Sequence, residues 1–164
     1  MVSFTYRTLT PDDAAAWQAL RLEGVRDFPL GFLTTVEEAV ASPERCREIL
    51  RHGGLRGVLA DETLVGFCGY RPQQLERTRH RCEIGPFFVT RRYQGAGAAT
   101  ALMRGVIDEA EGRGIAQIEL FVDTENLRAI AFYERQGFQR IATFRDSVRI
   151  DGKARQDHFM TLRL

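Results

Sequence analysis

The sequence predicts a mixed α/β domain of the α+β kind, built on one central, mostly antiparallel sheet. Three observations predict this class. Strand-like and helix-like segments follow one another in the order β-α-α-β-β-β-α-β-α-β-β. Two pairs of predicted strands are joined by tight turns, which indicates antiparallel hairpins. One strand runs through a glycine-rich turn into a helix, which indicates a β-α-β unit. The length of 164 residues suits a single domain, 1–164.

The first fifty residues predict one strand and two helical regions. Residues 4–9 alternate in the manner of a strand. Thr10 suits a helix N-cap, and the proline and two aspartates after it suit the first turn, so we expect a helix over 11–25. Residues 28–35 are apolar but contain proline and glycine, which predicts a loop. Residues 37–51 form the second helical region.

The middle of the chain predicts three strands and a long helix. Strands are expected over 55–60 and 64–71, and the short turn between them indicates a hairpin. A polar loop, 72–79, precedes a strand over 81–89. Apolar residues at helical spacing then predict a helix over 98–113, which two glycines end.

The last fifty residues predict a buried strand, a helix and a hairpin. Residues 116–122 read as the strand, and 127–136 as a helix that ends at a glycine. Strands over 138–150 and 155–162 flank an Asp-Gly pair, which is typical of a hairpin turn.

The composition narrows the classes of protein that fit. Hydrophobic residues make up 44% and the formal net charge is +1, which disfavours a nucleic-acid binder. The three cysteines form no Cys-x-x-Cys motif and no Cys/His cluster, so we expect reduced thiols and no metal site. The N-terminal segment has no apolar signal core, and no apolar run is long enough to cross a membrane. The expectation is a cytoplasmic protein without a membrane partner.

The glycine-rich turn lies between the strand 81–89 and the helix 98–113. Such a turn leaves free backbone N–H groups at the positive end of a helix dipole, an arrangement that suits a phosphate. A P-loop requires Lys followed by Ser or Thr, which this turn lacks. A dinucleotide-binding turn requires a third glycine or alanine, where Thr100 stands here. The turn therefore indicates a phosphate site of another kind.

Two segments resemble motifs of a known superfamily. Residues 94–99 (QGAGAA) resemble the Q/R-x-x-G-x-G/A motif that binds acyl-CoA in the GNAT superfamily, the acyl-CoA-dependent N-acyltransferases. Residues 126–138 resemble its N-x-x-A-x-x-x-Y-x-x-x-G-F segment. The element order matches over nearly the whole chain, although Arg91 stands where members often carry proline. The resemblance implies a GNAT-like fold with its sheet splayed at the cofactor site, and acetyl-CoA as co-substrate without a metal.

The resemblance also implies which residues contact the cofactor. Backbone amides of the turn would hold the pyrophosphate, and the pantetheine arm would pair with the end of the preceding strand. There a backbone N–H near Phe88 would polarise the thioester carbonyl. Asn126 either only caps its helix or also contacts the pantetheine. The expected cofactor-binding residues are Phe88, Val89, Gln94, Gly95, Ala96, Gly97, Ala98, Ala99, Asn126 and Tyr133.

Acyl transfer to an amine requires a base for the amine, stabilisation of the oxyanion and a proton for the leaving thiolate. The resemblance implies direct attack, without a protein nucleophile. Tyr133 matches the tyrosine that lies near the CoA sulfur in many members, so it is the candidate general acid, or else a core aromatic. Glu83 is the candidate general base, or else an ordinary residue at the pocket rim. His80 is a weaker candidate to assist, and Cys82 is expected to be a core thiol.

The predicted function is an N-acyltransferase that moves an acetyl group from acetyl-CoA to a primary amine of an unidentified small molecule or peptide. The alternative is a GNAT-fold module that binds or senses acyl-CoA with little catalysis. Residues 28–38, the loop 72–79 and the hairpin 146–155 are expected to build the acceptor pocket. The terminal strands, 138–164, leave open a homodimer in which they pair.

Overall fold

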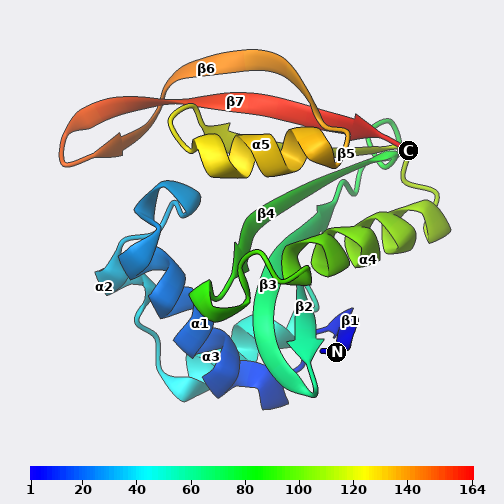
Figure 1. Ribbon diagram of the computed structural model, residues 1–164. Helices are drawn as coiled ribbons and strands as arrows, with labels where there is room; N and C mark the ends of the chain where they lie inside the picture. Colours follow the sequence, from blue (N-terminus) through cyan, green and yellow to red (C-terminus); the bar gives the residue numbers. More distant parts are fainter.

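A seven-stranded sheet forms the centre of the computed structural model, which describes residues 1–164 (Figure 1). The strand order is β1-β2-β3-β4-β5-β7-β6, and only the β4–β5 pair is parallel. This confirms the predicted mixed fold with a mostly antiparallel sheet. The strands are β1 (Phe4–Thr8), β2 (Leu55–Ala60), β3 (Thr63–Pro72), β4 (Arg81–Val89), β5 (Gln117–Asp123), β6 (Gln139–Ile150) and β7 (Lys153–Arg163).

The helices agree with the predicted order, with one difference. The region expected over 37–51 is two helices, because Thr35 and Glu38 form a capping box that starts the first and Ser42 caps the second. The helices are α1 (Ala14–Asp27), α2 (Val36–Ala39), α3 (Pro43–Arg51), α4 (Ala98–Gly112) and α5 (Leu127–Arg135), with short 3₁₀ helices η1 (Pro11–Asp13), η2 (Pro29–Gly31) and η3 (Arg91–Tyr93).

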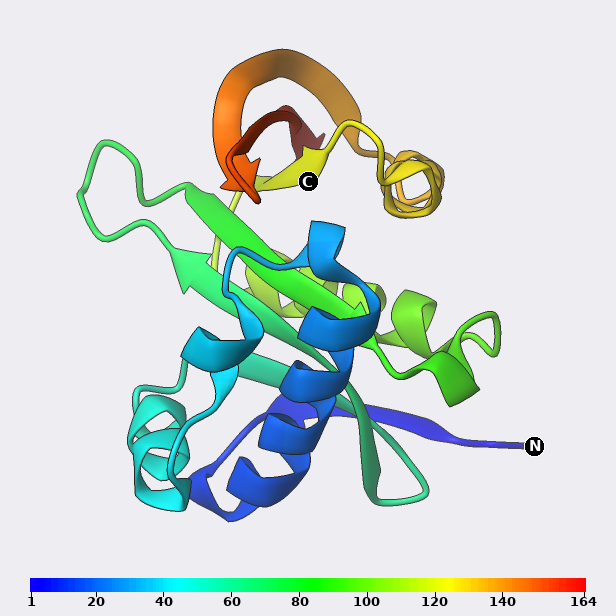
Figure 2. The same cartoon turned by 90° about the vertical axis from the view of Figure 1, so that its left-hand side faces the viewer.

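Helices cover both faces of the sheet. Figure 2 looks onto the face that α1 and α3 cover, with α4 behind the strands. Each face has its own cluster of buried side chains, one under α4 and α5 and the other under α1, α2 and α3. Phe87 packs against the first cluster, whereas its neighbour Phe88 belongs to the second. Strand β4 therefore lies between the two cores and contributes to both.

An extra residue interrupts the ladder between β3 and β4. Tyr70 lies opposite Ile84 and Cys68 opposite Phe87, so one residue of β3 faces two of β4, Gly85 and Pro86. The bulge shifts the alternation of β4 by one position. As a result Ile84 and Phe87 both face the core under α4, although they are three residues apart.

Strands β4 and β5 separate soon after they begin. They pair only between Arg81–Glu83 and Gln117–Glu119, and β4 then continues for six residues without a partner on that side. Beyond Glu119, β5 pairs on its other side with β7 as far as Asp123. The predicted splay is thus present, and it leaves the end of β4 with unpaired backbone groups facing β5.

Candidate active site

The turn after β4 has the backbone conformation that the two glycines allow. Gly95 has a φ of 79° and Gly97 a φ of 94°, both in the left-handed region that favours glycine. Gly97 is the N-cap residue of α4, so the turn leads directly into the helix start. No other atom of the chain lies within 4 Å of the place a Cβ of Gly95 would take, which leaves that side of the turn open.

Several backbone N–H groups at this helix start have no acceptor within the chain. The N–H of Gln94 donates to Arg91 and that of Ala96 donates to Tyr93, both at 3.2 Å to the carbonyl oxygen. The N–H groups without an acceptor are those of Gly95, Gly97, Ala98, Ala99 and Thr100. Unpaired N–H groups at the positive end of a helix form an anion site, so this cradle fits a pyrophosphate. The sequence did not indicate Thr100 as a member.

The side chain of Gln94 ties the turn to two neighbouring elements. Its Nε2 donates to the carbonyl oxygen of Val89 at 2.9 Å, and its Oε1 accepts from Arg128 at 2.7 Å. Arg128 lies in the first turn of α5, so a cation is held beside the cradle. The role of Arg128 was not predicted, since 34 positions separate it from Gln94 along the chain.

The hydrogen-bond pattern of β4 decides which backbone groups face the gap toward β5. The N–H of Thr90 donates to Val65 at 2.9 Å, and the register makes Phe88–Phe67 the next hydrogen-bonded pair. The peptide groups of Phe87 and Val89 then point away from β3, into the gap. The free backbone N–H groups near Phe88 are therefore those of its two neighbours, because the amide of Phe88 is used in the sheet.

Tyr133 lies on α5 and packs against Phe87 of β4, in the core under α4 and α5. Its ring is 8% exposed and packs against Phe87, Phe132 and Phe138 with centroids 5.6–6.1 Å away. Its hydroxyl forms no hydrogen bond within the chain. Burial raises the pKa of Tyr133, so the hydroxyl keeps its proton at neutral pH. Asn126 caps α5 by accepting from the N–H of Ala129 at 3.4 Å, as predicted.

Glu83 lies on the opposite face of β4 and is paired with an arginine. Its carboxylate accepts from Arg71 at 2.8 Å, and the same guanidinium donates to the carbonyl oxygen of Gly85. Its side chain is 35% exposed and lines a pocket on that face. Cys82, one residue earlier, is fully buried, and burial raises its thiol pKa to about 11. The expectation of a core thiol at Cys82 is confirmed.

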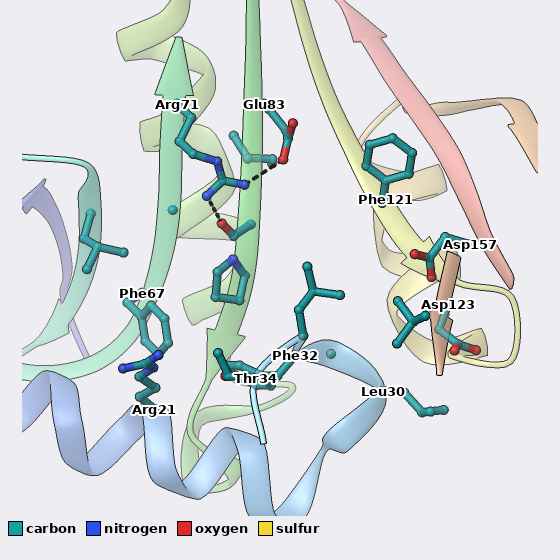
Figure 3. Close-up of a pocket in the computed structure, with 18 of the residues that line it drawn as sticks. Arg21, Leu30, Phe32, Thr34, Phe67, Arg71, Glu83, Phe121, Asp123 and Asp157 are labelled. Atoms are coloured by element: carbon teal, nitrogen blue, oxygen red, sulfur yellow. Dashed lines mark hydrogen bonds and ion pairs between the residues drawn. The ribbon is translucent and has the colours of Figure 1, made fainter. Parts of the chain in front are cut away.

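A pocket with a volume of about 730 Å³ opens beside Glu83 on the α1 face (Figure 3). Residues 29–34 form one wall, and the β6–β7 hairpin contributes Ser147 and Val148, as expected. The expectation that the loop 72–79 lines this pocket is wrong, because β3 continues to Pro72 and carries the loop past the rim. The pocket is also lined by residues of β5 and β7 that the sequence did not indicate, namely Phe121, Asp123 and Asp157.

No group of three or more His, Cys, Asp or Glu side chains is placed to hold a metal ion. None of the helices is long and apolar enough to cross a membrane.

The fold and the amide cradle together are those of a class of acetyltransferases. The family model "Acetyltransferase (GNAT) family" matches residues 17–138. The chain belongs to the GNAT family. Enzymes with this fold use acetyl-CoA, which agrees with the cradle at the start of α4.

Individual relatives agree with this assignment. A mycothiol acetyltransferase of Brachybacterium faecium is 33% identical over 130 residues, which is 77% of this chain and 38% of that protein. The N-alpha-acetyltransferase RimI of Mycobacterium tuberculosis is 35% identical over 102 residues, 62% of this chain and 61% of that protein. The chain thus spans less than two thirds of the length of either relative. A structure from Salmonella typhimurium, solved with its cofactor acetyl-CoA, has a TM-score of 0.82 at 17% identity, covering 98% of this chain and 94% of that one.

Proposed function

We propose that the protein transfers an acetyl group from acetyl-CoA to a primary amine by direct attack while both are bound. The observation that carries this proposal is the gap between β4 and β5. The peptide groups of Phe87 and Val89 point into this gap, the amide cradle follows at the end of β4, and the ring of Tyr133 packs against Phe87. The pocket that includes Glu83 lies on the other face of β4. The donor and the acceptor can therefore meet at the gap from opposite faces of the sheet.

The cofactor side follows from the backbone. Arg128 adds positive charge beside the free N–H groups that bind the pyrophosphate, those of Gly95, Gly97, Ala98, Ala99 and Thr100. The peptide groups of Phe87 and Val89 pair with the amide chain of the pantetheine arm. One of these N–H groups donates to the thioester oxygen, where negative charge develops during the reaction. Bound acetyl-CoA supplies the activated acetyl group.

Tyr133 is proposed as the general acid. Its pKa is raised by burial, so the hydroxyl carries its proton to the sulfur as the carbon–sulfur bond breaks. The hydroxyl is free for this role because no group of the chain accepts from it. The aromatic rings of Phe87 and Phe132 hold the ring in place at the gap.

Glu83 is proposed as the general base. Its carboxylate accepts a proton from the acceptor amine through a water, as the bond between nitrogen and the carbonyl carbon forms. The ion pair with Arg71 fixes the carboxylate at the pocket wall, next to the bulge that turns β4 toward the gap. The relatives that act on mycothiol and on protein N-termini agree with an amine acceptor, either small or peptidic.

A thiol-release assay with acetyl-CoA and a panel of amines and peptides tests the proposal. We expect Tyr133→Phe to lower kcat by about 10²- to 10⁴-fold, the usual contribution of a general acid. The matched control is Tyr70→Phe, because the hydroxyl of Tyr70 is buried without a hydrogen-bond partner and lies outside the gap. Binding of CoA without thiol release for any acceptor would favour the sensing module instead.

A further inference from the structure

The pocket beside Glu83 is lined on different walls by two charged side chains that form no ion pair, the half-buried Arg21 and the buried Asp157. The first is Arg21 on α1. Its guanidinium lies over the ring of Trp17 at 5.3 Å and donates weakly to the carbonyl oxygen of Ala39 at 3.4 Å. No carboxylate lies within ion-pair distance of it, and burial lowers the pKa of Arg21. The other arginines at the pocket are satisfied, since Arg45 pairs with Glu48 and Arg71 with Glu83.

The second charge is Asp157 on β7, which is 9% exposed. Its carboxylate forms no ion pair, although the side chains of Arg155 and His158 lie near enough to attract it. The hydroxyl of Ser147 lies near it but donates to the carbonyl oxygen of Arg155. Burial raises the pKa of Asp157, and Ser147 offsets part of that rise. Asp123 beside it is different, because Arg155 binds both of its carboxylate oxygens.

The two charges lie on opposite sides of the pocket with apolar walls between them. Figure 3 shows Arg21 rising from α1 toward Phe67, and Asp157 on the far wall next to Phe121. Phe32 lies between them in this view. Glu83 and Arg71 form an ion pair at the top of the pocket in Figure 3, so together they add no net charge. The pocket is therefore bipolar, with a cation at one side and an anion at the other.

A charge that is wholly or partly removed from water without a partner is costly in free energy, and a ligand of opposite charge reduces that cost. We propose that the acceptor is a small molecule that carries both a primary amine and an anionic group, with the amine between Asp157 and the base Glu83 and the anion on Arg21. This inference rests on the proposed function and adds the acceptor class. A carboxylate or a phosphonate satisfies Arg21 equally in chemical terms, because both accept from a guanidinium in a bidentate manner.

A peptide acceptor fits this pocket less well. The α-carboxylate of an N-terminal residue is taken up in a peptide bond, so that residue brings an amine for Asp157 but no anion for Arg21. The volume of about 730 Å³ lies in the range of small-molecule sites. The structure therefore favours a free amino acid or a similar molecule over a protein terminus.

The test compares acceptors that differ in one charge. The full-length protein is assayed by thiol release with the standard L-amino acids, with the amines that decarboxylation of each would give, and with the aminophosphonate analogues of the best acceptors. We expect at least one amino acid to be acetylated with a kcat/KM about ten- to hundredfold above that of its decarboxylated amine, the size of a charge-assisted contact. The phosphonate arm shows whether Arg21 requires a carboxylate or accepts any anion of this kind.

Two variants assign the preference to the named residues. Arg21→Met should raise KM for the amino acid by about ten- to hundredfold and leave KM for the decarboxylated amine unchanged. Its control is Arg26→Met, an exposed residue of the same helix outside the pocket. Asp157→Asn should raise KM for both acceptors, because both carry the amine. Its control is Asp151→Asn, in the exposed turn of the same hairpin.

Calorimetric titration of the best amino acid into the protein saturated with desulfo-CoA gives a readout that does not need turnover. Weaker binding in Arg21→Met than in Arg26→Met supports the proposal. Equal use of amino acids and their decarboxylated amines, or acetylation of peptides alone, overturns the inference but leaves the proposed function intact. Absence of thiol release with every acceptor overturns both.

Discussion

A buried ion pair between β2 and α4 allows a direct test of how the helix after the glycine turn is held in place. Arg56 is 3% exposed, and its Nε and Nη2 donate to the two carboxylate oxygens of Glu109 at 2.7 and 2.9 Å. Its guanidinium also lies 4.6 Å from the ring centroid of Tyr70. The hydroxyl of Tyr6 donates to the same carboxylate at 2.6 Å. Glu109→Gln keeps the volume of this side chain but leaves Arg56 without its counter-charge.

The expected loss follows from these distances and burial. Breaking one partner of a buried pair costs about 3–5 kcal/mol, and we expect about 3 kcal/mol because Glu109 is partly exposed. An unfolding entropy of about 2.1 cal/mol/K per residue gives about 0.34 kcal/mol/K for a chain of this length. The midpoint of thermal unfolding should therefore fall by about 9 °C. Differential scanning calorimetry measures it, with Glu111→Gln, an exposed position of the same helix, as the control.

The pH dependence provides a second measurement of the same pair. Burial would raise the pKa of Glu109, but hydrogen bonds from Arg56 and Tyr6 outweigh it and hold the pKa below its usual value. A carboxylate with a lowered folded pKa contributes stability above its unfolded pKa of about 4.3 and loses it as pH falls through the folded value. The free-energy difference between wild type and Glu109→Gln should then shrink below about pH 4.3. A loss under about 1 kcal/mol at neutral pH, or a difference independent of pH, would refute this reasoning.

Two glycine substitutions test the backbone of the site. Gly97→Ala places a Cβ at a φ of 94°, so we expect a loss of about 1–2 kcal/mol in unfolding free energy and weaker binding of CoA, read by urea titration and calorimetry; unchanged CoA affinity would remove Gly97 from the cradle. Gly69→Ala places a Cβ 2.1 Å from the carbonyl oxygen of Gly85, so the bulge must shift and thiol release should fall more than in Gly112→Ala, which meets no atom within 4 Å and lies outside the pocket. Equal activity of these two variants would show that the bulge does not position the gap.

The sequence was sufficient for most of the fold because its signals are local. Caps, glycine stops and the alternation of strands each involve a few neighbouring residues, and nearly every element lies within two residues of its expected bounds. The split of 37–51 was missed although its signal is local too, since Thr35 and Glu38 form a recognisable capping box. The cradle was also predictable, because a turn that opens a helix is a short segment.

The acceptor side was less predictable because long-range register determines it. Glu83 and Arg71 meet only because β3 and β4 pair in that register. Asp157 enters the pocket through the pairing of β7 with β5, and no pattern around it in the sequence indicates a buried carboxylate. The loop 72–79 was assigned to the pocket because it is close to Glu83 in the sequence. Closeness in the sequence does not determine the path of a loop in space.

Because of the bulge in β4, the geometry of the site depends on the number of residues between Glu83 and Phe87. Exchanging Gly85 or Pro86 for another residue leaves the number of positions between Glu83 and Phe87 unchanged, so the sides to which these residues point are preserved. Removing one of them would exchange the directions of Phe87 and Phe88, and the peptide groups that now face the gap would turn into the sheet. This segment is therefore expected to tolerate substitution better than a change of length, and in diverged copies the spacing from Glu83 to the glycine turn should persist longer than the residues between them.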